Sequence, residues 1–235
     1  MIKSHSKTIL LFLLPILASA QPSPSPSAHW TGSIRALQEF EMTLDLAQNA
    51  KREWIGTISL PFFKMVDVPV EKISVNGKTI QFDAGGSNYE GEISADGKRF
   101  FGTVLASIGS APFQLVRDGE AEVKLPPPST PLAREFEGTW EGTINIPTGE
   151  LRLQLILDRD AEGRAKGVIS TLESREVLTL SSITQTGKDL RFEVRVVGGV
   201  FKGSLNDANT EISGTWTEAN QEPRGLTMRR AENSK

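Results

Sequence analysis

The chain contains no cysteine, which excludes disulfide bonds, thiolate catalysis and zinc sites built from cysteine. Histidine is scarce as well, because His5 and His29 are the two in the chain. A histidine-ligated metal or a Ser-His-Asp triad would have to use His29, since His5 lies in an N-terminal segment that we expect to be removed. The sequence therefore predicts no catalytic residue, no metal site and no cofactor.

A basic run is also missing from the chain. The sequence has 26 Lys and Arg against 29 Asp and Glu, a formal net charge of −3. Without Lys3 and Lys7 in the first 20 residues, the balance becomes 24 − 29 = −5. A nucleic-acid-binding surface must neutralise phosphates, so this mildly acidic balance predicts no nucleic-acid partner.

Long apolar runs are absent after residue 20. Before it, residues 9–17 form an apolar stretch that follows two lysines and ends at Ala18-Ser19-Ala20. This order is typical of a secretory signal peptide over residues 1–20, cleaved before Gln21. The stretch is shorter than the ~20 residues of a membrane-spanning helix, and an uncleaved anchor is the alternative. After cleavage we expect no membrane span, and we predict that the protein is secreted or periplasmic. No Asn-x-Ser/Thr site occurs, which favours a bacterial protein.

Proline is concentrated in two segments, residues 21–27 and residues 123–133. Closely spaced prolines cannot join the interior of a sheet and hold the chain extended, as in a linker. We therefore predict two units, residues 28–122 and residues 134–232, each preceded by a proline-rich linker.

Both units contain short stretches in which apolar and polar residues alternate, which is the pattern of β-strands. The second unit opens with Trp140–Ile146 and Leu151–Leu157, and both alternate over most of their length. The first unit repeats this order about 110 residues earlier, beginning at Trp30. The dipeptides Asn76-Gly77 and Asp96-Gly97 are typical of tight hairpin turns, which join antiparallel strands.

The alternation predicts an all-β protein with two tandem eight-stranded antiparallel up-and-down barrels. Each strand is apolar on one face, and closing the sheet encloses that face and leaves no edge. Glycines two residues from an aromatic side chain, as in Tyr89/Gly91 and Phe201/Gly203, favour the sharp coiling of a small barrel. A two-sheet sandwich for each unit is the alternative.

The triplet Gly138-x-Trp140, with Arg230 near the end of the same unit, resembles the lipocalin (calycin) pattern. In that superfamily the tryptophan closes one barrel end and an arginine of the last strand packs across it. The resemblance implies closure by Trp140 with Arg230, and by Trp30 with Arg117 in the first unit. The chain is also similar to small β domains that precede serine-hydrolase domains in some secreted bacterial proteins. No hydrolase domain follows here, so the resemblance implies no hydrolase activity.

The interior of an eight-stranded barrel is just wide enough to be filled by side chains or to hold one small ligand. The second unit points mainly large residues inward, among them Trp140, Phe192, Phe201 and Trp216. This favours a packed core. A small apolar cavity near the open end is the alternative, and its ligand would be apolar or weakly polar.

The segment Pro61–Pro69 breaks the duplication, because the second unit is shorter and charged at this place. We interpret it as a loop that exposes an apolar patch, and such patches often mark contacts. The alternative is that it folds over its own barrel or against the other unit. The candidate contact residues for a ligand or partner are Trp54, Phe62, Phe63, Met65 and Tyr89.

These patterns predict a non-catalytic tandem β-barrel that binds a small apolar ligand or a protein partner. A structural or interaction module with solid barrels is the first alternative. An enzyme of hydrolase type, using barrel carboxylates or hydroxyls, is the second. The carboxylate pairs Glu39/Glu41 and Asp158/Asp160 lie where strands are expected to end and lack the spacing of a calcium loop.

Overall fold

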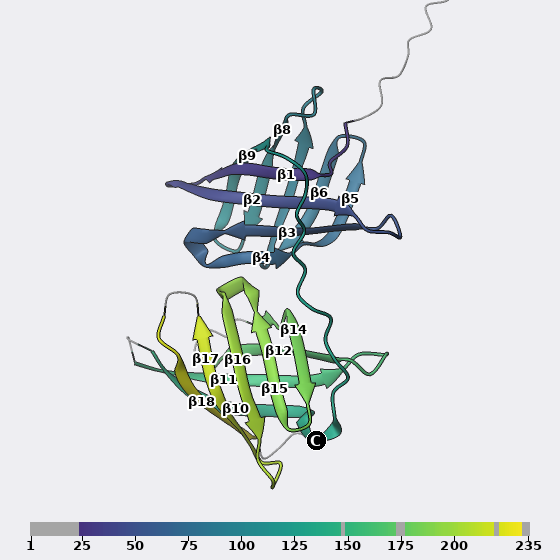
Figure 1. Ribbon diagram of the computed structural model, residues 1–235. Coiled ribbons are helices and arrows are strands. Elements are labelled where there is room, and N and C mark those ends of the chain that lie inside the picture. Colours follow the sequence, from purple (N-terminus) through teal and green to yellow (C-terminus); the bar gives the residue numbers. More distant parts are fainter. Residues whose placement is uncertain (1–23, 147–148, 173–176, 219–220, 232–235) are drawn as a thin grey trace, which may run out of the picture.

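A computed structural model describes residues 24–146, 149–172, 177–218 and 221–231. These residues form two nine-stranded antiparallel sheets, one after the other along the chain, and each sheet coils into a barrel (Figure 1). The prediction of two tandem all-β up-and-down barrels is confirmed. The predicted count of eight strands is wrong, because each sheet has nine. The predicted signal peptide, residues 1–20, lies outside the described residues.

The first barrel contains strands β1 to β9 and the short 3-10 helix η1 (Pro61–Phe63). Its sheet order is β4-β3-β2-β1-β9-β8-β7-β6-β5, so the first strand pairs with the last and the seam lies between β4 and β5. The strands are β1 (Ala28–Arg35), β2 (Glu39–Gln48), β3 (Trp54–Leu60), β4 (Met65–Pro69), β5 (Glu71–Asn76), β6 (Thr79–Ala84), β7 (Ser87–Ile93), β8 (Arg99–Ala106) and β9 (Gly109–Arg117).

The second barrel repeats this topology, with the order β13-β12-β11-β10-β18-β17-β16-β15-β14. The 3-10 helix η2 (Arg134–Phe136) precedes it, and η3 (Arg195–Val197) joins two of its strands. The strands are β10 (Gly138–Ile146), β11 (Gly149–Arg159), β12 (Ala165–Thr171), β13 (Val177–Thr179), β14 (Ser182–Thr186), β15 (Asp189–Val194), β16 (Gly199–Leu205), β17 (Glu211–Glu218) and β18 (Arg224–Arg230).

The seam of the second barrel is occupied by the chain that leads into it. The Thr130 N–H donates to the carbonyl of Ile183 on β14 (3.0 Å), and the Thr130 carbonyl accepts from Ala165 on β12 (2.8 Å). Leu132 beside it is buried. The last part of the proline-rich segment 123–133 therefore packs as part of the second barrel.

Strand β4 replaces the loop that the sequence led us to expect at Pro61–Pro69. Apolar and polar residues do not alternate regularly along β4, because the register against β3 shifts and Asp67 has a positive φ of 49°. Met65 and Val68 consequently both face the core although three positions separate them. Strand β14 was also unforeseen, since Ile183 is its one large apolar residue.

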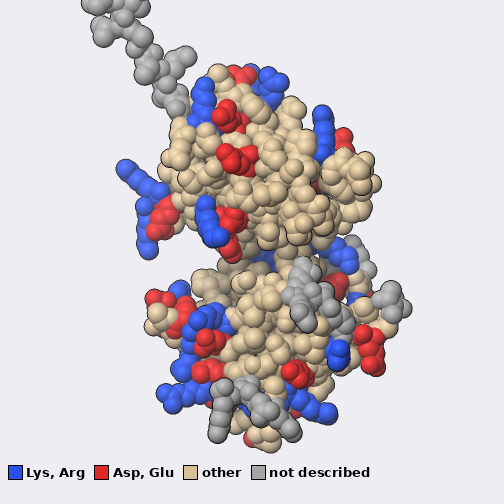
Figure 2. Space-filling model, turned by 180° about the vertical axis from the view of Figure 1, so that it is seen from behind, with Lys and Arg blue, Asp and Glu red and all other residues tan. Residues whose placement is uncertain are grey.

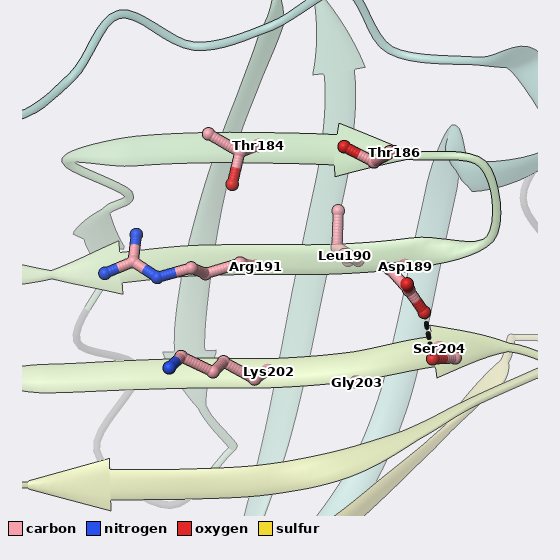
Figure 3. A pocket seen from close by; sticks show the side chains of 8 residues that line it. All are labelled: Thr184, Thr186, Asp189, Leu190, Arg191, Lys202, Gly203 and Ser204. Carbon is pink, nitrogen blue, oxygen red and sulfur yellow. Dashed lines mark hydrogen bonds between the residues drawn. The ribbon is translucent and has the colours of Figure 1, made fainter.

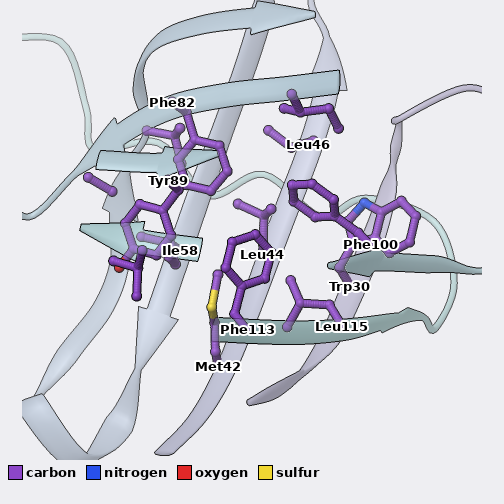
Figure 4. Packing of buried hydrophobic residues seen from close by; sticks show 14 of the residues in the cluster. Trp30, Met42, Leu44, Leu46, Ile58, Phe82, Tyr89, Phe100, Phe113 and Leu115 are labelled. Atoms are coloured by element: carbon purple, nitrogen blue, oxygen red, sulfur yellow. The ribbon is translucent and has the colours of Figure 1, made fainter. Parts of the chain in front are cut away.

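Inward-facing side chains fill the middle of the first barrel (Figure 4). Phe82 stacks on Tyr89 with ring centroids 4.8 Å apart, and Phe100 lies 5.1 Å from Phe113. The side chain of Trp30 is fully buried beside Phe100. On the face shown in Figure 2, acidic and basic side chains are interspersed over both barrels. This is the expected consequence of strands with one apolar and one charged face.

Paired glycines allow neighbouring strands to approach closely at the same place in both barrels. Gly102 lies opposite Gly91, and Gly214 lies opposite Gly203. A β-carbon on Gly214 would lie 2.1 Å from the carbonyl oxygen of Lys202 and 2.4 Å from the Cα of Gly203. Because backbone atoms cannot move aside, any side chain at this position would push the strands apart.

We predict that Gly214→Ala lowers the free energy of unfolding by about 1–3 kcal/mol, the usual cost of overpacking. Chemical denaturation followed by tryptophan fluorescence measures the loss. The matched control is Gly225→Ala on the adjacent strand, where a β-carbon would meet nothing within 4 Å. It should stay within about 0.5 kcal/mol of the parent. Equal stability of the two variants would contradict the role assigned to the glycine pair.

Candidate functional site

One end of the second barrel is closed by Trp140 and Arg230, which lie opposite each other on β10 and β18. The guanidinium carbon of Arg230 lies 4.2 Å from the centroid of the Trp140 ring. The indole N–H donates to the carbonyl of Phe136 (2.8 Å), and Arg230 donates to the carbonyl of Glu137 (2.7 Å). We call this end of each barrel the closed end, and the opposite end the mouth.

The first barrel has the same arrangement at its closed end. Arg117 lies opposite Trp30 across β9 and β1, with its guanidinium carbon 4.6 Å from the ring centroid. The Trp30 N–H donates to the carbonyl of Pro26 (3.0 Å), and Arg117 donates to the carbonyl of Ser27 (2.8 Å). Both contacts hold the segment that precedes β1 against the barrel. The closed ends are therefore blocked, and the mouth is the end at which a ligand could enter either barrel.

The mouth of the second barrel contains a cavity of about 330 Å³. Its wall is mainly apolar, and the polar side chains that line it include Glu218 at the end of β17 and Arg224 at the start of β18. The apolar wall includes Ile144, Leu151, Leu153, Ile169, Leu178 and Trp216. A mostly apolar hollow with a few convergent polar groups is the usual form of a small-molecule site.

Trp216 shapes this cavity because a glycine lies beneath it. A β-carbon on Gly199 would lie 2.1 Å from the indole of Trp216, so the ring rests directly on the backbone of β16. Its N–H donates to a carboxylate oxygen of Glu218 (2.9 Å), which fixes the ring. In the first barrel the position of Trp216 is taken by Val104, which pairs with Tyr89 as Trp216 pairs with Phe201. This part of the wall is specific to the second barrel.

The first barrel contributes two residues to the same cavity, Phe63 and Lys64. Lys64 ends η1 in the left-handed conformation, and its ammonium lies 3.2 Å from a carboxylate oxygen of Glu218. Phe63 is 45% exposed and packs against Phe40 and Phe62, with ring centroids 5.0 Å and 5.2 Å away. The site is therefore built by both barrels.

Arg195 on η3 joins the barrels next to this site. Its guanidinium donates to the carbonyl of Asp67 on β4 (2.8 Å) and to that of Lys124 between the barrels (2.5 Å). The neighbouring Val196 packs against both apolar cores. A charge-assisted hydrogen bond is stronger than a neutral one, so Arg195 holds β4 and η1 at the mouth of the second barrel.

The structure separates most of the candidate contact residues. Met65 is buried in the first core, where β4 places it, and this corrects the expectation of an exposed loop residue. Tyr89 is also a core residue, and burial raises its pKa to about 12. Trp54 begins β3 near the closed end of the first barrel, and Phe62 is 65% exposed outside the cavity. Of the five, Phe63 is brought to the cavity of the second barrel.

Sequence reasoning did not single out Trp216, Glu218 or Arg224 as site residues. The sequence did contain one indication of these site residues, because the two units differ here. The first unit has Val104, Ala106 and Ala111 at the corresponding positions. The contribution of Lys64 had no such indication, since the contact joins residues 154 positions apart.

A second hollow lies on the outer face of β14, β15 and β16 (Figure 3). It is lined by polar side chains, including Arg191 and Lys202, and the Ser204 hydroxyl donates to Asp189 (2.5 Å). It is a shallow surface groove without an enclosing wall, so it offers a ligand less burial than the mouth cavity. Within the described residues no group of three or more histidines and carboxylates is placed to hold a metal ion.

His29 and Asp45 form a further polar pair, with Nδ1 and a carboxylate oxygen 2.9 Å apart. The same carboxylate oxygen accepts from the backbone N–H of Glu122 (2.8 Å). The pair lies on the outer side of β1 and β2 and fixes the chain that follows β9. Its contacts account for it as a structural element.

No family model and no curated protein matches the chain. A candidate outer membrane protein of Bacteroides fragilis is 11% identical, over 86% of this chain and 94% of that one, with a TM-score of 0.25. A protein of unknown function from Nostoc punctiforme is 13% identical, over 87% and 94%, with a TM-score of 0.23. Transferrin binding protein B of Neisseria meningitidis is 9% identical, over 82% and 52%, with a TM-score of 0.25. Likenesses this low carry no inference about this chain.

No helix among the described residues has the length and apolar character needed to cross a membrane.

The contact that Arg195 makes between the two barrels should weaken in acid because of Glu193. The Glu193 carboxylate pairs with Arg191 and Arg195. Burial alone would raise its pKa, but the hydrogen bonds and charges of the two arginines outweigh burial and leave the pKa below its usual value. A carboxyl with a lowered pKa stabilises the fold above its unfolded pKa of about 4.3, and this contribution is lost as the pH falls through the folded pKa.

We therefore predict that the melting temperature of the parent exceeds that of Glu193→Gln at about pH 6 and that the gap narrows towards about pH 3. Differential scanning calorimetry across this range measures the gap. Glu120→Gln, at an exposed position, is the control and should follow the parent. If the difference in melting temperature between the parent and Glu193→Gln did not change with pH, Glu193 would not be the source of acid sensitivity.

Proposed function

We propose that this protein is a non-catalytic binding protein that takes up a small apolar molecule at the mouth of its second barrel. The observation that carries the proposal is the apolar cavity walled by Trp216 and completed by Phe63 of the first barrel. Its volume of about 330 Å³ is at the lower end of the ~300–1,000 Å³ typical of ligand pockets. The ligand is accordingly a small molecule with a mainly apolar body.

The proposal includes a lipocalin-like origin for both barrels and a site of action outside the cytoplasm. The first part is supported by the tryptophan–arginine contact at each closed end. The second is supported by the signal-peptide pattern of residues 1–20. The two units, residues 28–122 and 134–232, would then act together, with residues 129–133 packed on the second.

A protein partner on the first barrel is the second candidate function. Two hairpin tips at its mouth end expose apolar side chains almost completely, Leu37 between β1 and β2 and Ile108 between β8 and β9. Phe62 lies exposed on the same barrel. Native mass spectrometry of protein purified from its own host distinguishes the two, because a bound small molecule and a bound protein differ in mass.

Filling the cavity should weaken ligand binding. We predict that Leu178→Trp, which places an indole in the cavity, weakens binding of the neutral probe N-phenyl-1-naphthylamine by about tenfold or more, equivalent to ~1.4 kcal/mol. Probe fluorescence in a titration measures the affinity. Val177→Trp is the matched control, because Val177, which precedes Leu178 on β13, is 62% exposed and does not line the cavity. Equal affinity of both variants would place the probe elsewhere.

The contribution of the first barrel can be tested with two adjacent phenylalanines. Phe63→Ser should weaken probe binding by about three- to tenfold, because Phe63 lines the cavity. Phe62→Ser should leave binding near the parent value, since Phe62 packs in the same aromatic cluster but outside the cavity. Thermal unfolding of both variants shows whether their stabilities match. Similar affinities for the two would mean that the second barrel binds without the first.

A further inference from the structure

Arg224 differs from the other partly buried arginines of the described chain. Each of the others has a hydrogen bond or an ion pair, and these arginines are Arg117, Arg159, Arg191, Arg195 and Arg230. Within the parts of the chain that the structure describes, no hydrogen bond or ion pair engages the Arg224 side chain. Partial burial removes part of the water around a charge, and an opposite charge placed beside it would offset that cost.

The position of Arg224 shows where that opposite charge would lie. Arg224 stands directly opposite Trp216 across β17 and β18, and side chains of such a pair share one face of a sheet. Leu226 and Met228 follow on the same face and are buried in the core. Arg224 lines the mouth cavity together with Trp216.

The nearby carboxylate of Glu218 is already occupied. One of its oxygens accepts from the Trp216 N–H (2.9 Å), and the other lies 3.2 Å from the Lys64 ammonium. The latter oxygen also accepts from the side-chain amide of Gln221 (2.6 Å). The charged side chains that line the cavity, Lys64 and Arg224 against Glu218, sum to 2 − 1 = +1.

We propose that the ligand is an amphipathic acid, whose apolar body fills the mouth cavity and whose carboxylate pairs with Arg224. This inference rests on the proposed function and names its ligand class. The planar guanidinium fork matches the two oxygens of a carboxylate, and the ligand charge cancels the surplus positive charge of the cavity. The apolar wall on the other side supplies the hydrophobic part of the affinity.

The test compares three ligands with the same chain and different ends: octanoate, octanol and octylamine at neutral pH. Isothermal titration calorimetry on the full protein should give octanoate the highest affinity, roughly ten- to hundredfold above octanol. Octylamine should bind more weakly than octanol, because its ammonium meets Arg224.

Arg224→Met should remove the preference for octanoate while octanol binding stays within about twofold, because the apolar wall is unchanged. Arg224→Lys should retain part of the preference, since the charge is kept and the fork is lost. The control is Arg134→Gln, an exposed arginine on η2 near the closed end of the second barrel. The melting temperature of Arg224→Met should equal or exceed that of the parent, because the variant removes a charge that has no partner.

Two results would overturn the inference, and they differ in what they leave standing. Equal binding of octanoate and octanol, unchanged by Arg224→Met, rejects the acid and keeps an apolar ligand. Binding of neither compound, together with no binding of N-phenyl-1-naphthylamine, rejects the proposed function and the acid with it.

Discussion

The contact between a tryptophan of the first strand and an arginine of the last closes one end of each barrel. Trp30 and Arg117, and likewise Trp140 and Arg230, lie opposite each other where the first and last strands pair. The indole is wholly buried, and the arginine above it binds the carbonyls of the segment that enters the barrel. This pair of side chains therefore links the pairing of the first and last strands, the packing of the core and the position of the segment that enters the barrel. The position of the open mouth at the other end follows from it.

The two barrels share one strand order, and their differences are concentrated at the mouths. In the second barrel Trp216 rests on Gly199 and leaves a hollow beside it. The first barrel has Val104 at the place of Trp216, and Met65 is packed into its core from β4. Phe63 and Lys64 of the first barrel also line this hollow. The two units are therefore complementary at the cavity, where one supplies the wall and the other part of the rim.

The sequence predicts the fold where alternation is strong, as in Leu151–Leu157. The pairs at the closed ends were implied by the resemblance to the lipocalin pattern. Alternation fails at β4, because the positive φ of Asp67 and the register shift bring Met65 and Val68 to the same face. The site is predicted only in part. Arg195 binds the main-chain carbonyl of Asp67, and a carbonyl acceptor leaves no trace in residue identity. The hollow beside Trp216 likewise depends on how the ring lies on Gly199, which spacing does not reveal.

The segment between the barrels is held at both ends, at Lys124 by Arg195 and at Thr130 by β12 and β14. Residues 125–129 are the remaining span, and extended polyproline covers ~3.1 Å per residue, which gives about 16 Å. If the contacts of Arg195 opened, the tether would keep Phe63 at an effective concentration on the order of millimolar near the mouth. Reassociation would then be an intramolecular event that does not depend on the amount of protein in solution.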